Sequence, residues 1–189
     1  MHIIWALVFA AIMIYVAWWL IYAIRKRIIF EVEMALGVGS LWAAFATMNL
    51  AVPELLLWPS VLSLVGWTIF YLSIGLFVLT ILSLHRGGKP ASGWEHTTEL
   101  TTGGIHGLVR HPMQLSGILG ACAALLVKPT LAVLALSAVS ATCFALAARA
   151  EDRFNVAKFG QPYRIYMQQV PALNLLAGLW ARLRGRKKQ

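Results

Sequence analysis

The sequence predicts an all-α, polytopic membrane protein, and three observations predict it. The 189 residues are 60% hydrophobic and only 12% charged, about half the charged fraction of a soluble domain. The apolar residues form long runs without charge, most of them long enough to cross a bilayer as helices. The basic residues, which give a net charge of +9, lie between these runs. This composition excludes a soluble enzyme, a small secreted domain and a disordered chain.

Five runs are predicted to span the membrane: residues 3–24, 34–52, 60–84, 113–127 and 129–148. A helix rises 1.5 Å per residue, so about 20 apolar residues cross a hydrocarbon core of roughly 30 Å. The fourth run is short, and we expect it to tilt or to be partly buried against its neighbours. Only Lys128, followed at once by Pro129, separates the last two runs, which predicts an antiparallel hairpin of the fourth and fifth helices.

The basic residues predict the orientation. If all five runs span, 15 of the 16 lysines and arginines fall on one side, and only Lys128 falls on the other. Because cytoplasmic loops of membrane proteins carry the excess of Lys and Arg, that side is predicted to be cytoplasmic. The N-terminus is then outside and the C-terminus inside. The basic charge serves membrane topology in this interpretation, and no nucleic-acid partner is expected.

The segment after the fifth run is predicted to cap the cytoplasmic side, so that residues 1–189 form a single domain. Leu173, Leu176, Trp180 and Leu183 recur at helical spacing beside several arginines. Such a helix can lie in the headgroup plane of the membrane with its basic side toward anionic lipids. The alternative is a solvated basic tail that only fixes the topology.

Two motifs gather the sparse polar residues at the cytoplasmic side. The first, GIHGLVRHP at 104–112, ends the glycine-rich connection 85–112 and leads into the fourth run. Proline suits the first turn of a helix, and an Arg and free N–H groups at a helix start can receive a carboxylate. The second motif is Glu151-Asp152, followed by FGQPYRIY at 159–166 and Val170-Pro171. Taken alone, the first stretch could be a flexible interfacial connection, and the acids could pair with nearby arginines.

Together, in this order and after this membrane layout, the motifs resemble the integral membrane methyltransferases. These include the isoprenylcysteine carboxyl methyltransferases and the phospholipid N-methyltransferases. The resemblance covers residues 95–171. It implies that S-adenosyl-L-methionine is held between the connection 85–112, the helical hairpin and the C-terminal segment, and that a lipophilic substrate arrives from the membrane. No metal is expected, because neither cysteine, Cys122 or Cys143, stands in a metal-ligand spacing.

The resemblance assigns site residues by position. His106 stands where the family has a cofactor-contacting Tyr, and Glu151 matches the acid that binds the cofactor's amino group. Candidates for catalysis are Arg110, as partner of a carboxylate, and His106 or Asp152, as acceptor of a proton from an amine substrate. The expected cofactor contacts are Thr98, Glu99, Leu100, Thr101, Gly104, His106, His111, Pro112, Met113, Gln114, Glu151 and Tyr163; Tyr166 matches the segment that caps the site.

Three departures from the family pattern bear on the methyl acceptor. Gln114 replaces the usual Tyr after His-Pro-x, and Asp152 replaces a second Glu. Prenylcysteine enzymes carry an Arg one turn before the acid, where this chain has Ala147. An amine-bearing phospholipid is therefore favoured over an isoprenylcysteine-like carboxylate. The expected partners are this lipid and the bilayer, with no obligate protein partner.

Two other functions stay open from sequence. Sterol reductases of membranes share a similar Arg-His-Pro hairpin but bind NADPH, and they have Asn and Tyr after the proline, unlike Met113 and Gln114. A non-enzymatic membrane protein that kept the fold is the second alternative. His111 and Glu151, which keep the family pattern, favour an active methyltransferase over this second alternative.

Overall fold

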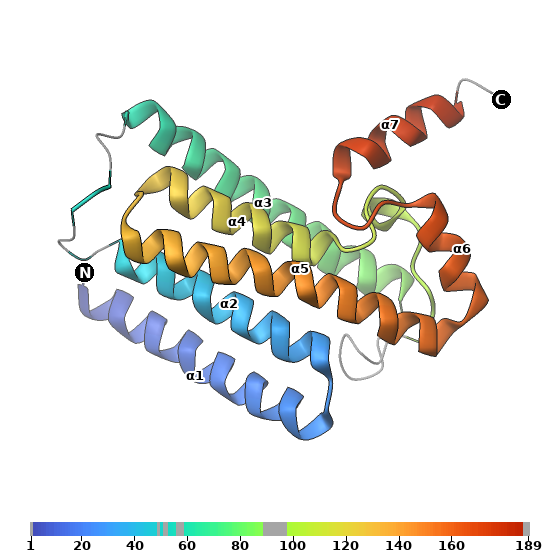
Figure 1. The fold of residues 1–189 in the computed structure, drawn as a ribbon, viewed down its shortest axis with the longest axis horizontal. Helices are drawn as coiled ribbons and strands as arrows, with labels where there is room; N and C mark the ends of the chain where they lie inside the picture. The colour runs from blue at the N-terminus through green and yellow to red at the C-terminus, as the bar shows by residue number, and fades with distance from the viewer. Residues whose placement is uncertain (1, 49, 51–52, 56–58, 89–97, 187–189) are drawn as a thin grey trace. The chain divides into compact units, whose positions relative to one another are not determined.

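The computed structural model describes residues 2–48, 50, 53–55, 59–88 and 98–186. In this part of the chain every regular element is a helix (Figure 1), as the sequence predicts. The elements are α1 (His2–Lys26), α2 (Ile29–Thr47), α3 (Ser60–Gly87), the 3-10 helix η2 (Gly104–Gly107), α4 (Pro112–Val127), α5 (Leu131–Phe159), α6 (Gln161–Gln169) and α7 (Leu175–Arg186).

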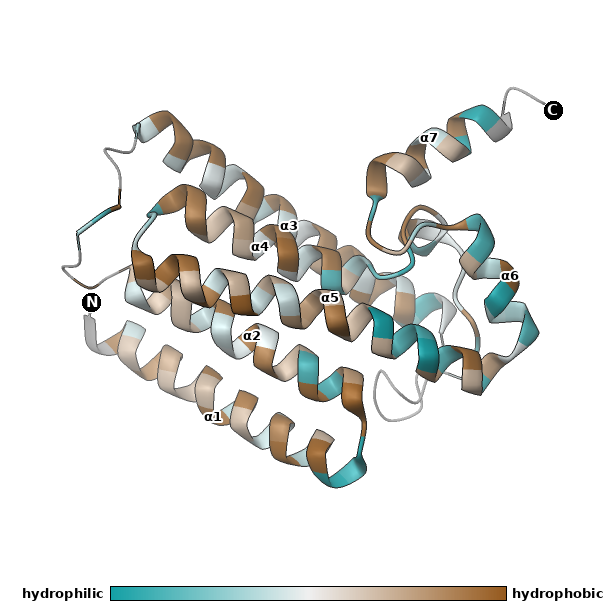
Figure 2. Cartoon of the chain, viewed as in Figure 1, coloured by the Kyte–Doolittle hydropathy of each residue, from teal (hydrophilic) through white to brown (hydrophobic). Residues whose placement is uncertain are grey.

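Four of these helices, α1, α2, α3 and α5, are long and apolar enough to cross a membrane, and α4 is a shorter apolar helix. Hydrophobic residues dominate α1 to α4, whereas hydrophilic residues gather on α6 and the adjoining end of α5 (Figure 2). Only 6% of the most apolar stretch of α1 is buried, so its side chains need a lipid environment. The count of five spans and the hairpin of α4 and α5 stay predictions.

Helix α2 is shifted by five residues from the predicted span 34–52: it begins at Ile29 and ends at Thr47. The prediction excluded Glu31 and Glu33 from an apolar helix. In the structure Glu31 is only 2% exposed, and it accepts a hydrogen bond from Nε1 of Trp19 on α1. A hydrogen-bonded carboxylate is tolerated in a buried position, so α2 can begin at Ile29 and include both glutamates. Residues 49 and 51–52 of the predicted span lie outside the described residues.

Helix α5 continues eleven residues beyond the predicted span 129–148, to Phe159. The prediction followed hydropathy, but Glu, Arg, Lys and Ala are all good helix formers in water. The helix ends only at Gly160, whose φ of 65° is a conformation that favours glycine. Glu151 and Asp152 therefore stand within a rigid helix and not at its end.

The chain divides into two compact units, Met1–Ser73 with Gly117–Ala150 and Ile74–Ser116 with Glu151–Gln189. In the first unit small residues allow close helix packing, as in other membrane proteins. A Cβ on Gly117 of α4 would lie 2.3 Å from the Phe144 ring of α5, and one on Gly37 of α2 would lie 3.2 Å from the same ring. Ser140 Oγ donates to the Gly37 carbonyl at 2.9 Å.

Lys128, between α4 and α5, has a structural partner in the same unit. Its Nζ donates to the carbonyls of Met48 and Leu50 at 2.9 and 3.0 Å. These carbonyls follow the C-terminal end of α2, where the helix dipole favours a cation. Lys128 thus binds the chain just beyond this helix end, besides any effect of its charge on topology.

Candidate functional site

All residues of this site belong to the second unit, in which two backbone hydrogen bonds join the predicted motifs. The Arg110 N–H donates to the Pro171 carbonyl at 2.9 Å, and the His111 N–H donates to the Ala172 carbonyl at 3.0 Å. This pairing places the residues before α4 beside the Val-Pro segment, 61 residues later in the chain. The sequence indicated that both segments belong to one site, and these bonds bring them together.

A side-chain hydrogen bond joins the 3-10 helix η2 to α6. Tyr166 OH donates to the His106 carbonyl at 2.6 Å. Gly104 begins this turn with a φ of 58°, a conformation that residues with a Cβ rarely adopt. The glycines of the first motif therefore serve a tight turn that exposes the His106 carbonyl to α6.

Arg110 uses four of its five N–H donors inside the protein. Its Nε and Nη2 donate to Oδ1 and Oδ2 of Asp152 at 3.2 and 2.9 Å. Its Nη1 donates to the carbonyls of Met167 and Val170 at 2.9 and 2.6 Å. The side chain is only 8% exposed. An arginine occupied in this way holds α5 and the end of α6 together and has little capacity left for a ligand carboxylate.

Asp152 is equally occupied. Besides both bonds from Arg110, it accepts a hydrogen bond from His111 Nε2 at 2.8 Å and one from Tyr163 OH at 2.7 Å. Burial and the neighbouring Asp152 raise the pKa of Tyr163, so its hydroxyl stays protonated and donates. Three of these four hydrogen bonds meet at Oδ1 and one is made to Oδ2, and two of the donor residues are cationic. This arrangement favours the ionised carboxylate and argues against Asp152 as a free base.

His111 lies between two carboxylates. Its Nε2 contacts Asp152, and its Nδ1 lies 3.3 Å from Oε2 of Glu151. Burial works to lower the pKa of this side chain, which is 1% exposed, but the two carboxylates outweigh burial and raise the pKa to about 9. At neutral pH His111 is therefore an imidazolium with an N–H on each nitrogen, of which Nε2 donates to Asp152.

Glu151 is the carboxylate of this cluster that remains accessible. Its Oε2 accepts a hydrogen bond from Nε2 of Gln114 and faces His111, while the side chain is still 28% exposed. Two neighbours thus fix the carboxylate in one orientation and leave part of it open. Gln114 itself is buried, so the residue that departs from the family pattern supports the acid directly.

His106 has a different environment. Its ring is buried and its Nδ1 lies 3.1 Å from Oγ of Ser83 on α3. Burial lowers the pKa of His106 to about 4, and the nearby His111 contributes in the same direction. His106 is therefore neutral at pH 7 and a weak base. Ser83 was not among the predicted residues, since a serine in an apolar span carries no signal of its own.

The remaining predicted residues lie in the sequence just before and just after η2. Thr98 and Glu99 are exposed, and their N–H groups donate to the Gly88 carbonyl at 3.0 and 3.4 Å. Leu100, Thr101 and Met113 are half-buried, and Pro112 begins α4, as predicted. Residues 89–97 of the predicted connection 85–112, and 187–189 of the predicted cap, lie outside the described residues.

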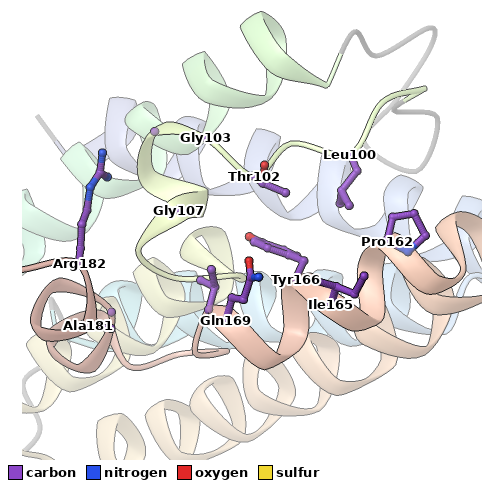
Figure 3. A pocket seen from close by; sticks show the side chains of 13 residues that line it. Leu100, Thr102, Gly103, Gly107, Pro162, Ile165, Tyr166, Gln169, Ala181 and Arg182 are labelled. Atoms are coloured by element: carbon purple, nitrogen blue, oxygen red, sulfur yellow. The ribbon is translucent and has the colours of Figure 1, made fainter. Parts of the chain in front are cut away.

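A cavity of about 690 Å³ lies beside η2 (Figure 3). Its lining comes from the segment 100–107, from α6 and from α7. Of these lining residues, the sequence analysis named Leu100 and Gly104 as cofactor contacts and Tyr166 in the capping segment, but it gave no site role to Gln169 or Arg182. Arg182 was interpreted only as a basic residue toward lipid, because its position relative to η2 depends on how α7 packs.

The sequence profile of the phospholipid methyltransferase family matches residues 61–162, more than half of the chain. The chain belongs to the phospholipid methyltransferase family. The family resemblance stated from the motifs is thereby confirmed. No curated protein and no solved structure matches the chain significantly.

Membership in the phospholipid methyltransferase family gives the activity class, methyl transfer at a membrane to a lipid substrate, and it favours neither the reductase nor the non-enzymatic alternative. The match includes η2, α4 and the acids of α5 but ends at Pro162. Tyr163, Tyr166 and α7 thus lie beyond the part of the chain that defines the family. Among the described residues, no group of three His, Cys, Asp or Glu side chains could hold a metal ion.

Proposed function

We propose that this phospholipid methyltransferase transfers a methyl group from S-adenosyl-L-methionine to an amine-bearing phospholipid at the cytoplasmic face of the membrane. One observation carries the proposal. Glu151 is the partly exposed carboxylate of a cluster in which Arg110 and Asp152 are occupied with each other and His111 uses only Nε2, on Asp152. A site of this kind offers one anionic acceptor in a fixed position.

The residues present fit the polar end of this methyl donor. Its amino group needs an acceptor, which Glu151 supplies, and its carboxylate needs donors, which the imidazolium of His111 and the start of α4 supply. The adenosyl part would lie against the segment 98–101, Gly104 and Pro112–Gln114, with Tyr163 nearby. His111 Nδ1, a buried atom without a well-oriented hydrogen bond among the described residues, supports a donor role at this place.

Arg110 and Asp152 take positioning roles in this proposal, because their hydrogen bonds are used within the protein. Bound S-adenosyl-L-methionine supplies an electrophilic methyl group on a sulfonium. The chain then has to hold the lipid nitrogen in line with that methyl, and such positioning is worth up to roughly 7–11 kcal/mol of barrier. The nitrogen must be neutral to form its new bond to carbon. His106 can accept a hydrogen bond from it, and the released proton goes to water.

The acceptor is proposed to be an amine-bearing phospholipid and not an isoprenylcysteine-like carboxylate. A carboxylate acceptor calls for a free arginine near the acid. Ala147 stands at the position where prenylcysteine enzymes have one, and Arg110 is bound to Asp152. Both observations support the amine.

The membrane arrangement is also part of the proposal. We propose five spans, α1 to α5, with the N-terminus outside and with the C-terminus and the site in the cytoplasm. Helix α7 would lie along the membrane surface, and the bilayer and its lipid are the expected partners. The side distribution of the basic residues supports this arrangement.

The test is binding of S-adenosylhomocysteine to the detergent-purified full chain by calorimetry. We expect micromolar binding that Glu151→Gln weakens about tenfold or more, since it loses a charge-assisted hydrogen bond. Arg153→Gln is the matched control, because Arg153 is the exposed next neighbour on α5. Binding of NADPH in place of the methyl-donor product would overturn the proposal, and so would equal binding by the Glu151 and Arg153 variants.

A further inference from the structure

The cavity of about 690 Å³ lies in a part of the chain that the family match only partly includes. One wall is the segment around η2, which the match covers; the others come from α6 and α7, of which the match reaches only Pro162. Helix α7 is attached to this wall very closely. A Cβ on Gly178 would lie 1.7 Å from the Leu108 carbonyl oxygen, so glycine alone permits this contact. The cavity is therefore built by a specific packing of α7.

Arg182 is the cationic residue of this lining. It extends from α7 along the turn between Gly103 and Gly107 (Figure 3), and its Nη1 lies 3.9 Å from where a Cβ of Gly107 would be. Within the described part of the chain, Arg182 makes no hydrogen bond or ion pair. Arg184 on the same helix differs, because its guanidinium lies over the Trp180 ring, 4.7 Å from the centroid. Arg182 is exposed, and an unpaired guanidinium at the edge of a cavity is suited to bind an oxyanion.

The other lining residues suit a lipid headgroup. Leu100, Pro162 and Ile165 are apolar, while Gln169 and Thr102 offer polar atoms. The cavity also adjoins the polar cluster of the proposed cofactor site. Tyr166 lines the cavity, and its ring packs edge-on against Tyr163 with 5.7 Å between centroids. Tyr163 in turn donates to Asp152, the neighbour of Glu151.

Helix α7 also has the character of a membrane-surface helix. It leaves four large apolar side chains exposed: Leu176 78%, Leu179 44%, Trp180 59% and Leu183 50%. Together with its arginines this pattern is typical of a helix at the level of the lipid headgroups. Lipid phosphates lie at that level, so this character of α7 favours a lipid headgroup as the anion at Arg182.

We propose that this cavity binds the phosphodiester of the lipid substrate through Arg182. The proposal rests on the proposed function and deepens it: α7 makes the enzyme select a lipid amine that carries a phosphate over one that does not. Arg182 is then a specificity-determining residue. It acts on substrate binding and not on the methyl-donor site.

The test compares two acceptors, a short-chain phosphatidylethanolamine and dodecylamine, with the full chain in detergent. We expect Arg182→Gln to raise the Kd and the KM for phosphatidylethanolamine about tenfold or more and to leave kcat and the KM for dodecylamine unchanged. Arg184→Gln is the matched control and should change neither. Equal effects of the two variants, or equal loss with both acceptors, would overturn the assignment of Arg182.

Two further measurements separate the possible sources of the anion. If Arg182→Gln weakens S-adenosylhomocysteine binding, Arg182 serves the cofactor's carboxylate and the lipid proposal is wrong. If inorganic phosphate binds as tightly as phosphatidylethanolamine, the cavity is a site for free phosphate and the proposal is also wrong. Absence of S-adenosylhomocysteine binding in the wild type refutes the proposed function instead. Calorimetry with phosphatidylethanolamine still measures the affinity of the cavity for the lipid in that case.

Discussion

Arg110 and Asp152, 42 residues apart in the sequence, form a two-point ion pair: Nε and Nη2 of the guanidinium lie 3.2 and 2.9 Å from the two carboxylate oxygens. The side chains are only 8% and 15% exposed. Each also has further partners, the carbonyls of Met167 and Val170 for the arginine and the donors of His111 and Tyr163 for the aspartate. The pair is thus the centre of the contacts that join the residues just before α4 to α5 and α6.

Asp152→Asn is expected to destabilise the protein strongly. An amide cannot accept both bonds from Arg110 and leaves that guanidinium buried and uncompensated, which costs about 3–5 kcal/mol. The thermal unfolding midpoint in detergent should fall by about 6–20 °C. Arg153→Gln, one residue along α5 and exposed, should change it little. Similar midpoints for the two variants would mean that the ion pair contributes nothing to stability.

The stability of the protein is expected to fall at alkaline pH because of His111. The folded protein raises the pKa of this side chain from 6.5 to about 9, through the carboxylates of Asp152 and Glu151. The extra stability is therefore fully present below pH 6.5 and is lost as the pH rises through 9, by up to about 3 kcal/mol. Thermal unfolding between pH 6.5 and 9.5 measures this loss. His111→Gln should be less stable at pH 6.5 and should lose the pH dependence; an unchanged slope would contradict the prediction.

Gly178→Ala is expected to detach α7 from the rest of its unit. The added Cβ would lie 1.7 Å from the Leu108 carbonyl oxygen. This oxygen belongs to the backbone, so the clash can be relieved only if α7 or the segment at Leu108 moves. Protease cleavage before α7 should become faster, and phosphatidylethanolamine binding should weaken. Gly75→Ala is the matched control, since it is also helical and meets nothing within 4 Å. There alanine, which favours helix, should leave the protein as stable as before or slightly more so.

Cysteine labelling tests the proposed topology and the number of spans together. In a Cys122→Ser, Cys143→Ser background, a membrane-impermeant maleimide on intact cells should label Glu54→Cys, between α2 and α3. It should label Gln161→Cys, after α5, only once the cells are lysed. If α4 does not cross the membrane, α5 ends on the other side and Gln161→Cys is labelled on intact cells. That result would refute the five-span arrangement.

The sequence was sufficient for features that depend on local pattern. A long apolar run in lipid can make all its backbone hydrogen bonds within itself only as a helix. The all-α class therefore follows from composition. Pro112 marked the start of α4 because a proline suits the first turn and disfavours a helix before it. The motif around Arg110 and His111, with the acids at 151 and 152, was enough to indicate the family. The bounds of α2 and α5 were less well predicted, because hydropathy marks where a helix enters lipid and not where it ends.

The roles within the cluster depended on tertiary structure. By sequence Arg110 was a candidate partner for a ligand carboxylate and Asp152 a candidate base. The fold brings them into contact and uses their hydrogen bonds on each other, which leaves Glu151 as the accessible acid. The low pKa of His106 and the high pKa of His111 likewise result from burial and from neighbours distant in sequence. The position of Arg182 beside η2 depends on a contact between Gly178 and Leu108, 70 residues apart, which no local pattern encodes.

The sequence by itself thus determined the class, the membrane character and the family, since these follow from residue types and their spacing. Only the tertiary structure decided which charged groups are free, because charge pairing depends on distances across the fold.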